Sequence, residues 1–323
     1  MSRSAILLVG GMGTRLHPLT LNTPKPMLPV AGVPFTAHQI AKAKAAGITE
    51  IVLATAFKAE IFYPYFGNGE KFGIEIKYAV EESALGTGGA IRNAADQLKG
   101  TGPVAIFNGD VLTGHDLDGQ FNFHAQNAAE VTLYLTQVPD ARAFGAVELD
   151  RQLQVTAFNE KMENPPTNII NAGCYIFNRE VIHQIPNGKV VSVERETFPT
   201  LLSNGAKVFG FVDNSYWLDI GTPAALLKAS QDLLSGAITS GATPKVTGNF
   251  LELEGAVISP SAKVGGYSVV GAGAEIEAEA KIEGSVIFDG AKIGARSVLT
   301  NCFVAPNFQV PADLVAINNF FGF

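Results

Sequence analysis

The last quarter of the chain carries a repeat with a period of six residues, which few folds can accommodate. Apolar residues recur at every sixth position: Ile258, Val264, Val270, Ile276, Ile282 and Phe288, then, after a slip of one residue, Ile293 and Leu299. A small residue stands two positions before nearly all of them: Ala256, Ala262, Ser268, Ala274, Ala280, Ala291 and Ser297, with Val286 as the exception. Each coil of a parallel β-helix buries such a residue against its neighbours. The pattern therefore predicts a short left-handed parallel β-helix over residues 256–305, of about three coils.

Two other interpretations of this segment fit the sequence less well. Irregular β-hairpins do not predict eight regularly spaced apolar residues. A hexapeptide-repeat acyltransferase would carry a catalytic histidine within the coils, and residues 256–305 contain none. We interpret the coils as a scaffold or an assembly surface, with a Gly/Ser/Thr-rich linker at 236–255 and an apolar tail at 306–323. A homo-oligomer, either a dimer or a tetramer, is expected.

The residues before the linker have a different pattern. From residue 5 to about 235, short apolar runs such as AILLV, EIVLAT and PVAIF alternate with helix-like stretches such as TAHQIAKAKAAGI. This alternation predicts βαβ units, and hence an α/β domain over 1–235 with a Rossmann-like, mostly parallel sheet. The runs in LLVGGMG and IFNGD break abruptly into glycine and polar residues. Because right-handed crossovers bring such breaks to one rim of the sheet, a ligand site is expected there.

Composition and charge exclude several other classes of protein. The chain has 323 residues, of which 47% are hydrophobic and 16% charged, as in globular proteins. A net charge of −7 argues against a nucleic-acid surface. Two cysteines, Cys174 and Cys302, are too few for a disulfide framework or a structural zinc site and are expected to be buried thiols. No apolar run approaches the roughly 20 residues that span a bilayer, so a cytoplasmic protein without a membrane partner is expected.

The glycine-rich turn GGMGTRLHPLT, which follows the run AILLV, is compatible with three phosphate-binding chemistries. No spacing fits the P-loop pattern. The dinucleotide fingerprint lacks its third glycine, and no acidic residue occurs before Glu50. The third possibility is a loop that wraps a triphosphate while Arg15 and Lys25 neutralise it. The two prolines flanking Lys25 are expected to hold it on a stiff extended segment, which lowers the entropy cost of positioning it.

The motif LVGGMGTRLHPLTLNTPKPMLPVAG resembles the signature of the sugar-phosphate nucleotidyltransferases. Six later segments agree with this family in the same order: EESALGTGGAI, FNGD, AFGAV, FNEK, NAGCYIF and YWLDIGTP. The resemblance covers roughly residues 4–235, and a hexapeptide tail is a common appendage of the family. Within the family, the chain is most similar to members that use GTP and mannose-1-phosphate.

The reaction that the resemblance implies is attack of a sugar-1-phosphate oxygen on the α-phosphorus of a nucleoside triphosphate, with loss of pyrophosphate. A phosphate monoester is largely dianionic near neutral pH because its second pKa is about 6, so it needs no general base. Positioning and charge neutralisation then carry the reaction. We accordingly assign no chemistry to the five histidines.

The resemblance also implies roles for individual residues. Asp110 and Asp219 match the aspartates that bind the metal, and two carboxylates together with phosphate oxygens suit Mg²⁺. Arg15 and Lys25 would neutralise the phosphates. The other expected nucleotide contacts are Gly10, Gly11, Gly13, Thr14 and Gly86. The expected sugar-phosphate contacts are Gly145, Glu160, Lys161 and Asn171, and Met162 stands where the family usually has proline after the lysine.

The choice of nucleobase can be argued from chemistry. Related thymidylyltransferases carry Gln where this chain has Glu81, with Glu82 beside it. Guanine presents two adjacent N–H donors that an ionised carboxylate can accept, whereas thymine presents one donor between two acceptors. Glu81, with Glu82 second, is therefore expected to select guanine; a solvated acidic pair on a loop is the alternative.

Two alternative functions stay open. One is the same reaction with another substrate pair, such as glucose-1-phosphate with dTTP or UTP. The other is a non-catalytic regulatory subunit that binds sugar nucleotides. Such a subunit is expected to have lost some of its site residues, whereas Arg15, Lys25, Asp110 and Asp219 are all present.

Overall fold

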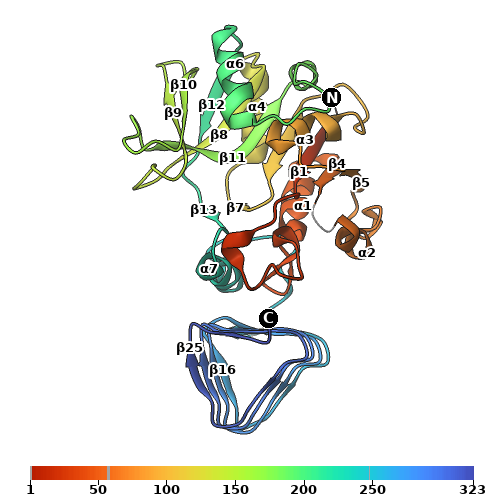
Figure 1. Ribbon diagram of the computed structural model, residues 1–323, viewed down its shortest axis with the longest axis vertical. Coiled ribbons are helices and arrows are strands. Elements are labelled where there is room, and N and C mark those ends of the chain that lie inside the picture. The colour runs from red at the N-terminus through yellow and green to blue at the C-terminus, as the bar shows by residue number, and fades with distance from the viewer. Residues whose placement is uncertain (1, 57–58, 247) are drawn as a thin grey trace. The chain divides into compact units, whose positions relative to one another are not determined.

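The computed structural model describes residues 2–56, 59–246 and 248–323. The chain divides into two compact units, each assembled from separate stretches: Met1–Met12 with Gln39–Trp217, and Gly13–His38 with Leu218–Phe323 (Figure 1). The domain boundaries expected at residues 235, 255 and 305 remain predictions. The helices are α1 (Phe35–Ala45), α2 (Phe62–Phe66), α3 (Gly86–Ala95), α4 (Leu117–Gln126), α5 (Arg179–Ile182), α6 (Phe198–Ser203) and α7 (Pro223–Ser235).

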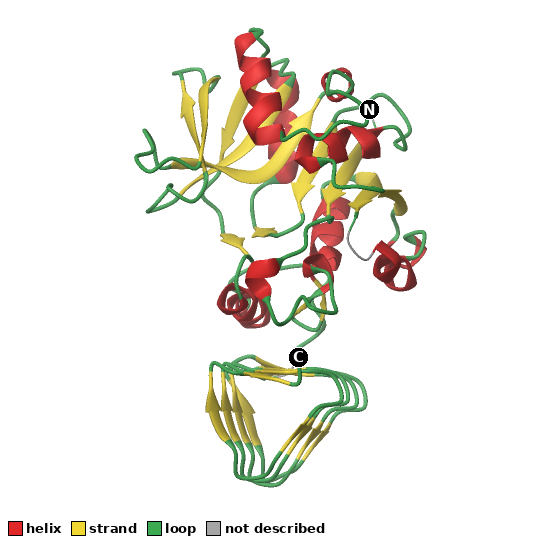
Figure 2. Cartoon of the chain, viewed as in Figure 1, coloured by secondary structure: helices red, strands yellow, loops and turns green. Residues whose placement is uncertain are grey.

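A nine-stranded sheet forms the core of the first unit (Figure 2). Its parallel part has the order β5-β4-β1-β6, and antiparallel β11 follows β6 and pairs with β8, which is parallel to β12. These strands are β1 (Arg3–Leu8), β4 (Ile48–Thr55), β5 (Glu75–Val80), β6 (Val104–Asn108), β8 (Val131–Gln137), β11 (Ile169–Phe177) and β12 (Val208–Val212). β9 (Gly145–Leu149) and β10 (Val155–Glu160) extend the sheet beyond β11. The predicted α/β class with a largely parallel central sheet is confirmed.

The strand order places a topological switch point between β1 and β6. The chain leaves β1 for β4 on one side, whereas β6 lies on the other side of β1. In open α/β sheets, ligands bind outside the carboxyl ends of the strands at such a point. Gly109, directly after β6, donates its N–H to the carbonyl of Leu8 at 3.0 Å, and a Cβ at Gly109 would lie 2.2 Å from that oxygen. Only glycine allows this close approach of the two strand ends.

The second unit contains the predicted β-helix, built from three parallel sheets (Figure 1). One has five strands: β14 (Phe250–Glu252), β17 (Ser268–Val270), β20 (Val286–Ile287), β23 (Phe303–Val304) and β26 (Phe320–Phe321). The second has β15 (Val257–Ile258), β18 (Glu275–Ile276), β21 (Lys292–Ile293) and β24 (Gln309–Val310). The third has β16 (Lys263–Gly265), β19 (Lys281–Glu283), β22 (Val298–Thr300) and β25 (Val315–Ile317). The coils thus begin inside the segment interpreted as a linker and continue through the predicted tail, which gives four coils where about three were expected.

The register of the coils corrects one assignment in the repeat. Val270 pairs with Ile287, and Ile287 pairs with Val304, so Ile287 rather than Phe288 occupies the inward position. Ile287 is fully buried, whereas Phe288 is half-buried. The one-residue slip therefore precedes Ile287. The small residue two positions earlier is Ser285, which is also fully buried, and the exception at Val286 disappears.

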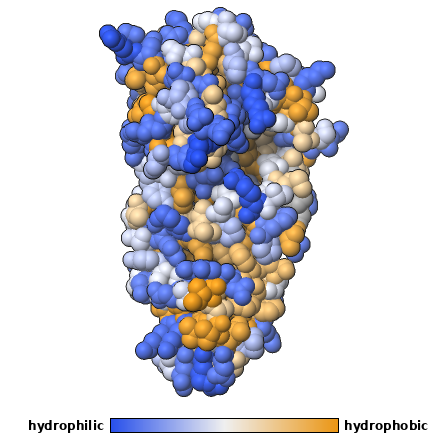
Figure 3. Space-filling model, turned by 60° about the vertical axis from the view of Figure 1, so that its left-hand side comes forward, coloured by the Kyte–Doolittle hydropathy of each residue, from blue (hydrophilic) through white to orange (hydrophobic). Residues whose placement is uncertain are grey.

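Part of the second unit packs against these coils. α7 begins at Thr222, whose hydroxyl accepts the N–H of Ala225, and ends at Gly236 with a φ of 81°. Gln231 on α7 donates its Nε2 to the carbonyl of Gly284 at 3.3 Å. The last coil presents exposed Val315 and Ile317, and Figure 3 shows apolar surface on the coil region.

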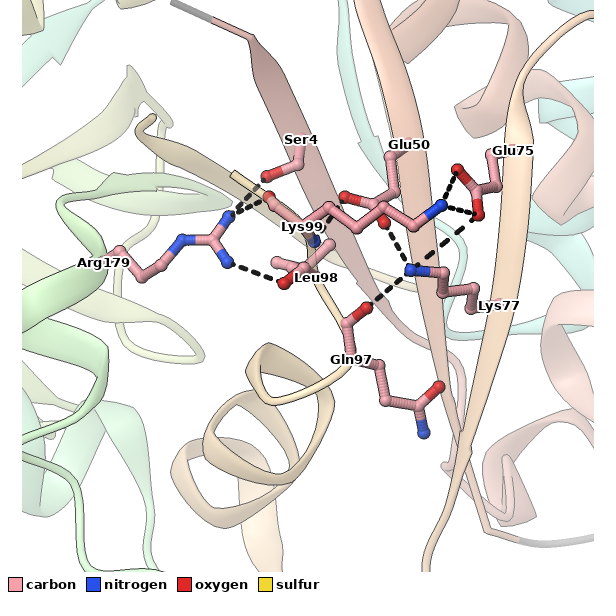
Figure 4. Close-up of polar contacts among 8 residues, drawn as sticks. All are labelled: Ser4, Glu50, Glu75, Lys77, Gln97, Leu98, Lys99 and Arg179. Atoms are coloured by element: carbon pink, nitrogen blue, oxygen red, sulfur yellow. Dashed lines mark hydrogen bonds and ion pairs between the residues drawn. The ribbon is translucent and has the colours of Figure 1, made fainter. Parts of the chain in front are cut away.

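A polar network joins the amino-terminal ends of the sheet strands in the first unit (Figure 4). Lys77 Nζ contacts Glu50 Oε1 at 2.6 Å, and Glu50 Oε2 accepts the backbone N–H of Lys99 at 2.9 Å. The Arg179 guanidinium donates to the carbonyls of Leu98 and Lys99 at 3.1 and 3.0 Å. These contacts pair the buried Glu50 carboxylate with a cation and hold the connection between α3 and β6. Because ligands bind at the other strand ends, we interpret the network as structural.

No helix among the described residues is long and apolar enough to cross a membrane. Cys174 and Cys302 are free buried thiols, as expected, and burial raises the pKa of Cys174 to about 12.

Candidate active site

The glycines after β1 form the first wall of the candidate site. A Cβ at Gly10 would lie 3.3 Å from the Cβ of Ala56 and 3.7 Å from Glu81 Oε1. Gly11 is exposed, and a Cβ there would meet no atom within 4 Å. The loop therefore presents open backbone beside Glu81, as a phosphate- or base-binding loop requires.

The structure distinguishes the two adjacent glutamates. Glu81 is half-buried, accepts the N–H of Leu85 on Oε2 at 2.8 Å, and donates its own N–H to the carbonyl of Thr55. Burial raises the pKa of Glu81, and the bond from Leu85 partly offsets that rise. Glu82 is exposed. Of the pair, only Glu81 has a fixed carboxylate, and its Oε1 faces Gly10.

The glycines at the start of α3 are needed for packing. Gly86 has a φ of 69°, and a Cβ there would lie 2.6 Å from the carbonyl oxygen of Val191. The same carbonyl accepts the N–H groups of Gly88 and Gly89 at 2.8 and 3.3 Å. These two first-turn donors are thus satisfied within the protein, and the nucleotide contact expected at Gly86 stays a prediction.

The four residues expected to bind the sugar phosphate come together on β9, β10 and β11. Glu160 pairs with Gly145 across β10 and β9, and a Cβ at Gly145 would lie 2.9 Å from Glu160 Oε2. Lys161 Nζ lies 3.5 Å from Glu160 Oε1. The backbone N–H of Lys161 donates to the carbonyl of Phe144. Asn171 follows Ile170, which pairs with Ala146. A cation, a carboxylate and an amide therefore share one surface, which suits a ligand with both phosphate and hydroxyl groups.

The remaining predicted residues lie in the second unit, apart from Asp110. A Cβ at Gly13 would lie 2.8 Å from the Cβ of Lys25, so these two residues are in contact. A Cβ at Gly221, two residues after Asp219, would lie 3.0 to 3.1 Å from the Arg15 guanidinium. The second unit thus brings the arginine to the segment that carries Asp219, with Thr14 exposed beside it.

The expected extended conformation around Lys25 is wrong. Lys25–Met27 form a 3₁₀ turn, in which Met27 donates to the carbonyl of Pro24 at 2.8 Å and Leu28 to that of Lys25 at 3.1 Å. Proline fixes φ near −65°, a value that a helical turn uses as readily as an extended chain does. The turn still positions Lys25 against Gly13.

Asp110 follows β6 at the switch point and is half-buried. Asp219 ends β13 (Trp217–Asp219) and is also half-buried. Over the described ranges, no cluster of three or more His, Cys, Asp or Glu side chains is arranged to hold a metal ion. The carboxylates of Asp110 and Asp219 are the donor type that Mg²⁺ takes alongside phosphate oxygens and water.

Comparison with known proteins places these features in a family. The nucleotidyl transferase family model matches residues 4–236, and the model of the GMPPB C-terminal domain matches residues 246–319. The chain belongs to the nucleotidyl transferase family. The match includes the glycine loop, both aspartates and the surface on β9–β11.

Two proteins that are similar to this nucleotidyl transferase are named for guanylyl transfer to mannose-1-phosphate. It is 49% identical, over 91% of its length and 82% of the relative's, to the mannose-1-phosphate guanylyltransferase of Mycobacterium tuberculosis. It is 36% identical, over 81% of its length and 73% of the relative's, to a Neurospora crassa mannose-1-phosphate guanyltransferase. Among solved structures, HddC from Yersinia pseudotuberculosis complexed with GMP-PN is 28% identical, with a TM-score of 0.60, over 72% of this chain and all of the other.

Sequence reasoning missed two side-chain groups beside the sugar-phosphate surface of the transferase. Trp217 donates its Nε1 to the carbonyl of Ala172 at 3.0 Å and packs edge-on against Phe144, with ring centroids 5.3 Å apart. Asn171 bonds the hydroxyl of buried Tyr175, which contacts Glu194. Trp217 is the only tryptophan in the sequence, and this could have marked it as a candidate site residue. Nothing in the local sequence marks Glu194, because its partners are distant along the chain.

Proposed function

We propose that this enzyme is a mannose-1-phosphate guanylyltransferase, which joins GTP and mannose-1-phosphate into GDP-mannose and releases pyrophosphate. The observation that carries the proposal is the 49% identity, over 91% of the chain, to a relative of that name. The geometry of the first unit supports it. Glu160, Lys161 and Asn171 offer a carboxylate and an amide for sugar hydroxyls and an ammonium for the phosphate, on strands beside the switch point.

The proposed mechanism relies on positioning and charge. Lys161, with an exposed side chain, would hold the phosphate of mannose-1-phosphate, whose oxygen attacks the α-phosphorus without a general base. Arg15 and Lys25 would neutralise the triphosphate, while Gly10, Gly11 and the Gly13–Thr14 turn would present backbone N–H groups to it. The leaving group is pyrophosphate.

We propose that Asp110 and Asp219 hold Mg²⁺. Carboxylate donors fit this ion, and neither Asp110 nor Asp219 is a fully buried residue. When bound, the ion would offset the negative charge of the phosphates.

Glu81 would select the base. Its Oε2 is occupied by the N–H of Leu85, while Oε1 faces the Gly10 loop and keeps lone pairs for the N1–H and N2–H₂ groups of guanine. The test is Glu81→Gln, assayed with GTP and with dTTP. We expect the ratio of kcat/KM for GTP over dTTP to fall at least about tenfold. Glu82→Gln removes the same charge from the exposed neighbour and is expected to leave the ratio unchanged. An unchanged ratio in Glu81→Gln would overturn the assignment.

The homo-oligomeric state stays a prediction, for which exposed Val315 and Ile317 on β25 offer apolar surface. The cytoplasmic location also stays a prediction.

A further inference from the structure

A chain of hydrogen bonds runs behind the proposed hexose surface. Asn171 Nδ2 donates to Tyr175 Oη at 2.8 Å, and Tyr175 Oη donates to Glu194 Oε1 in a long contact of 3.5 Å. Tyr175 is fully buried and Asn171 is half-buried. The three side chains therefore connect a residue that ligand can reach to a carboxylate behind it.

Glu194 is anchored through its other oxygen. Glu194 Oε2 accepts the hydroxyl of Thr87, in the first turn of α3, at 2.7 Å and the hydroxyl of Ser192 at 3.1 Å. The Thr87 oxygen itself accepts the N–H of Val193 at 2.9 Å, so its proton is directed to Glu194. Glu194 lies in the π-helical turn η5 (Val193–Thr197), a conformation that is rare and often found at functional sites.

The hydrogen bonds run from Asn171 through Tyr175 to Glu194, because a carboxylate only accepts hydrogen bonds. The hydroxyl of Tyr175 directs its single proton to Glu194 and accepts from Asn171, and the side chain of Asn108 also contacts this hydroxyl. The amide of Asn171 is held at both ends: its NH₂ group faces Tyr175, and its Oδ1 accepts the N–H of Gly173 at 3.2 Å. One lone pair of Oδ1 and one proton of Nδ2 remain for a ligand.

Burial raises the pKa of Tyr175 far above its usual value, and the charge of Glu194 adds to the rise. The environment of Tyr175 therefore favours the protonated phenol, which is the form that donates to Glu194.

We infer that Glu194 is a positioning residue for hexose recognition, which acts through Tyr175 to fix the orientation of the Asn171 amide. The inference rests on the proposed function, since Asn171 is the proposed hexose contact. It assigns the residue a role in sugar selection without contact to the sugar.

The variant Glu194→Gln specifically removes the acceptor of the Tyr175 hydroxyl proton. Thr87 and Ser192 both donate to the position of Oε2, so the carbonyl oxygen of Gln takes that place and its NH₂ group faces Tyr175. Tyr175 Oη then loses the acceptor of its proton and meets a donor in its place, so the contact that holds Nδ2 of Asn171 is weakened. We expect the KM for mannose-1-phosphate to rise about five- to tenfold, with the KM for GTP unchanged.

Glu196→Gln is the matched control. Glu196 lies in the same turn, and its Oε1 accepts the backbone N–H of Ser192 at 2.8 Å. It loses the same charge and is expected to leave both KM values unchanged. Tyr175→Phe breaks the chain at its centre and is expected to raise the KM for mannose-1-phosphate as Glu194→Gln does. In the Tyr175→Phe background, Glu194→Gln should add nothing.

A second readout does not depend on activity. The side-chain ¹⁵N–¹H₂ resonances of Asn171, measured without substrate, should move in Glu194→Gln and Tyr175→Phe and stay in place in Glu196→Gln. Unmoved resonances in folded Glu194→Gln protein, or an unchanged KM for mannose-1-phosphate in both Glu194→Gln and Tyr175→Phe, would overturn the inference. If the unmodified enzyme turns over no sugar phosphate, the proposed function fails, and the resonances still decide the orientation of the amide.

Discussion

The substitution Gly145→Ala perturbs the sugar-phosphate surface at a single point. A Cβ at Gly145 would lie 2.7 Å from Phe158 Cζ and 2.9 Å from Glu160 Oε2, whereas ordinary contact begins at 3.4 Å. Phe158 is held by Phe198, with ring centroids 5.1 Å apart, so its ring is the stiffer neighbour. The carboxylate of Glu160 must therefore give way by about half an ångström or more.

The displacement sets the expected magnitude. A misplacement of about 1 Å at a reacting centre can cost about 100-fold, so half of that predicts a loss of about tenfold in kcat/KM, or about 1.4 kcal/mol. The loss should appear in the KM for mannose-1-phosphate, since Glu160 is proposed to bind the sugar, while the KM for GTP stays constant.

Pyrophosphate release, measured while each substrate is varied in turn, checks this prediction. Gly114→Ala is the control, because a Cβ at Gly114 would meet its nearest neighbour, the Cβ of Tyr216, at an ordinary 3.6 Å. Gly114→Ala should unfold at nearly the same temperature as the unmodified enzyme, whereas Gly145→Ala should unfold at a somewhat lower temperature because its Cβ crowds the Phe158 ring. A Gly145→Ala enzyme with unaltered kcat/KM for mannose-1-phosphate would refute the role given to Glu160.

Three further predictions concern stability. Lys77→Met leaves the buried Glu50 carboxylate without its cation and should lower the free energy of unfolding by about 3 kcal/mol in urea titration; a loss below about 1 kcal/mol would contradict this. Burial, the largest cause, lowers the pKa of His115 to about 3, so the unfolded chain binds a proton from about pH 6.5 downward while the folded protein does not. His115 should therefore contribute a fall in stability of up to about 1.4 kcal/mol per pH unit below that point, and the fall should be less steep in His115→Gln. Finally, Ile287→Ala should cost about 2–4 kcal/mol and Phe288→Ala clearly less, and the reverse order would contradict the observed register.

Much of the fold could be predicted from the sequence because its two periodicities are local. The register slip was misplaced because Phe288 is as apolar as Ile287, and hydrophobicity alone does not distinguish them. The final coil escaped detection because Phe308 and Leu314 replace the small residues that mark earlier coils two positions before Val310 and Ala316.

The site could be predicted only where a motif is contiguous. Glu160 and Lys161 are adjacent in the sequence, and β10 pairs with β9 through a short connection, so their proximity to Gly145 follows from a hairpin. Glu194 was missed because its hydrogen bond to Thr87 joins residues 107 positions apart. Such pairing depends on how α3, β11 and η5 pack, which no short sequence window contains.

One measurement tests the central claim most directly. Purified protein is incubated with each of GTP, dTTP, UTP and ATP, in combination with mannose-1-phosphate and glucose-1-phosphate, with Mg²⁺ and with excess EDTA, and both products are quantified. We predict equal amounts of GDP-mannose and pyrophosphate from GTP and mannose-1-phosphate, far above any other pair, and loss of both products in EDTA. No product from any pair, or faster turnover of glucose-1-phosphate with dTTP or UTP, would contradict the account.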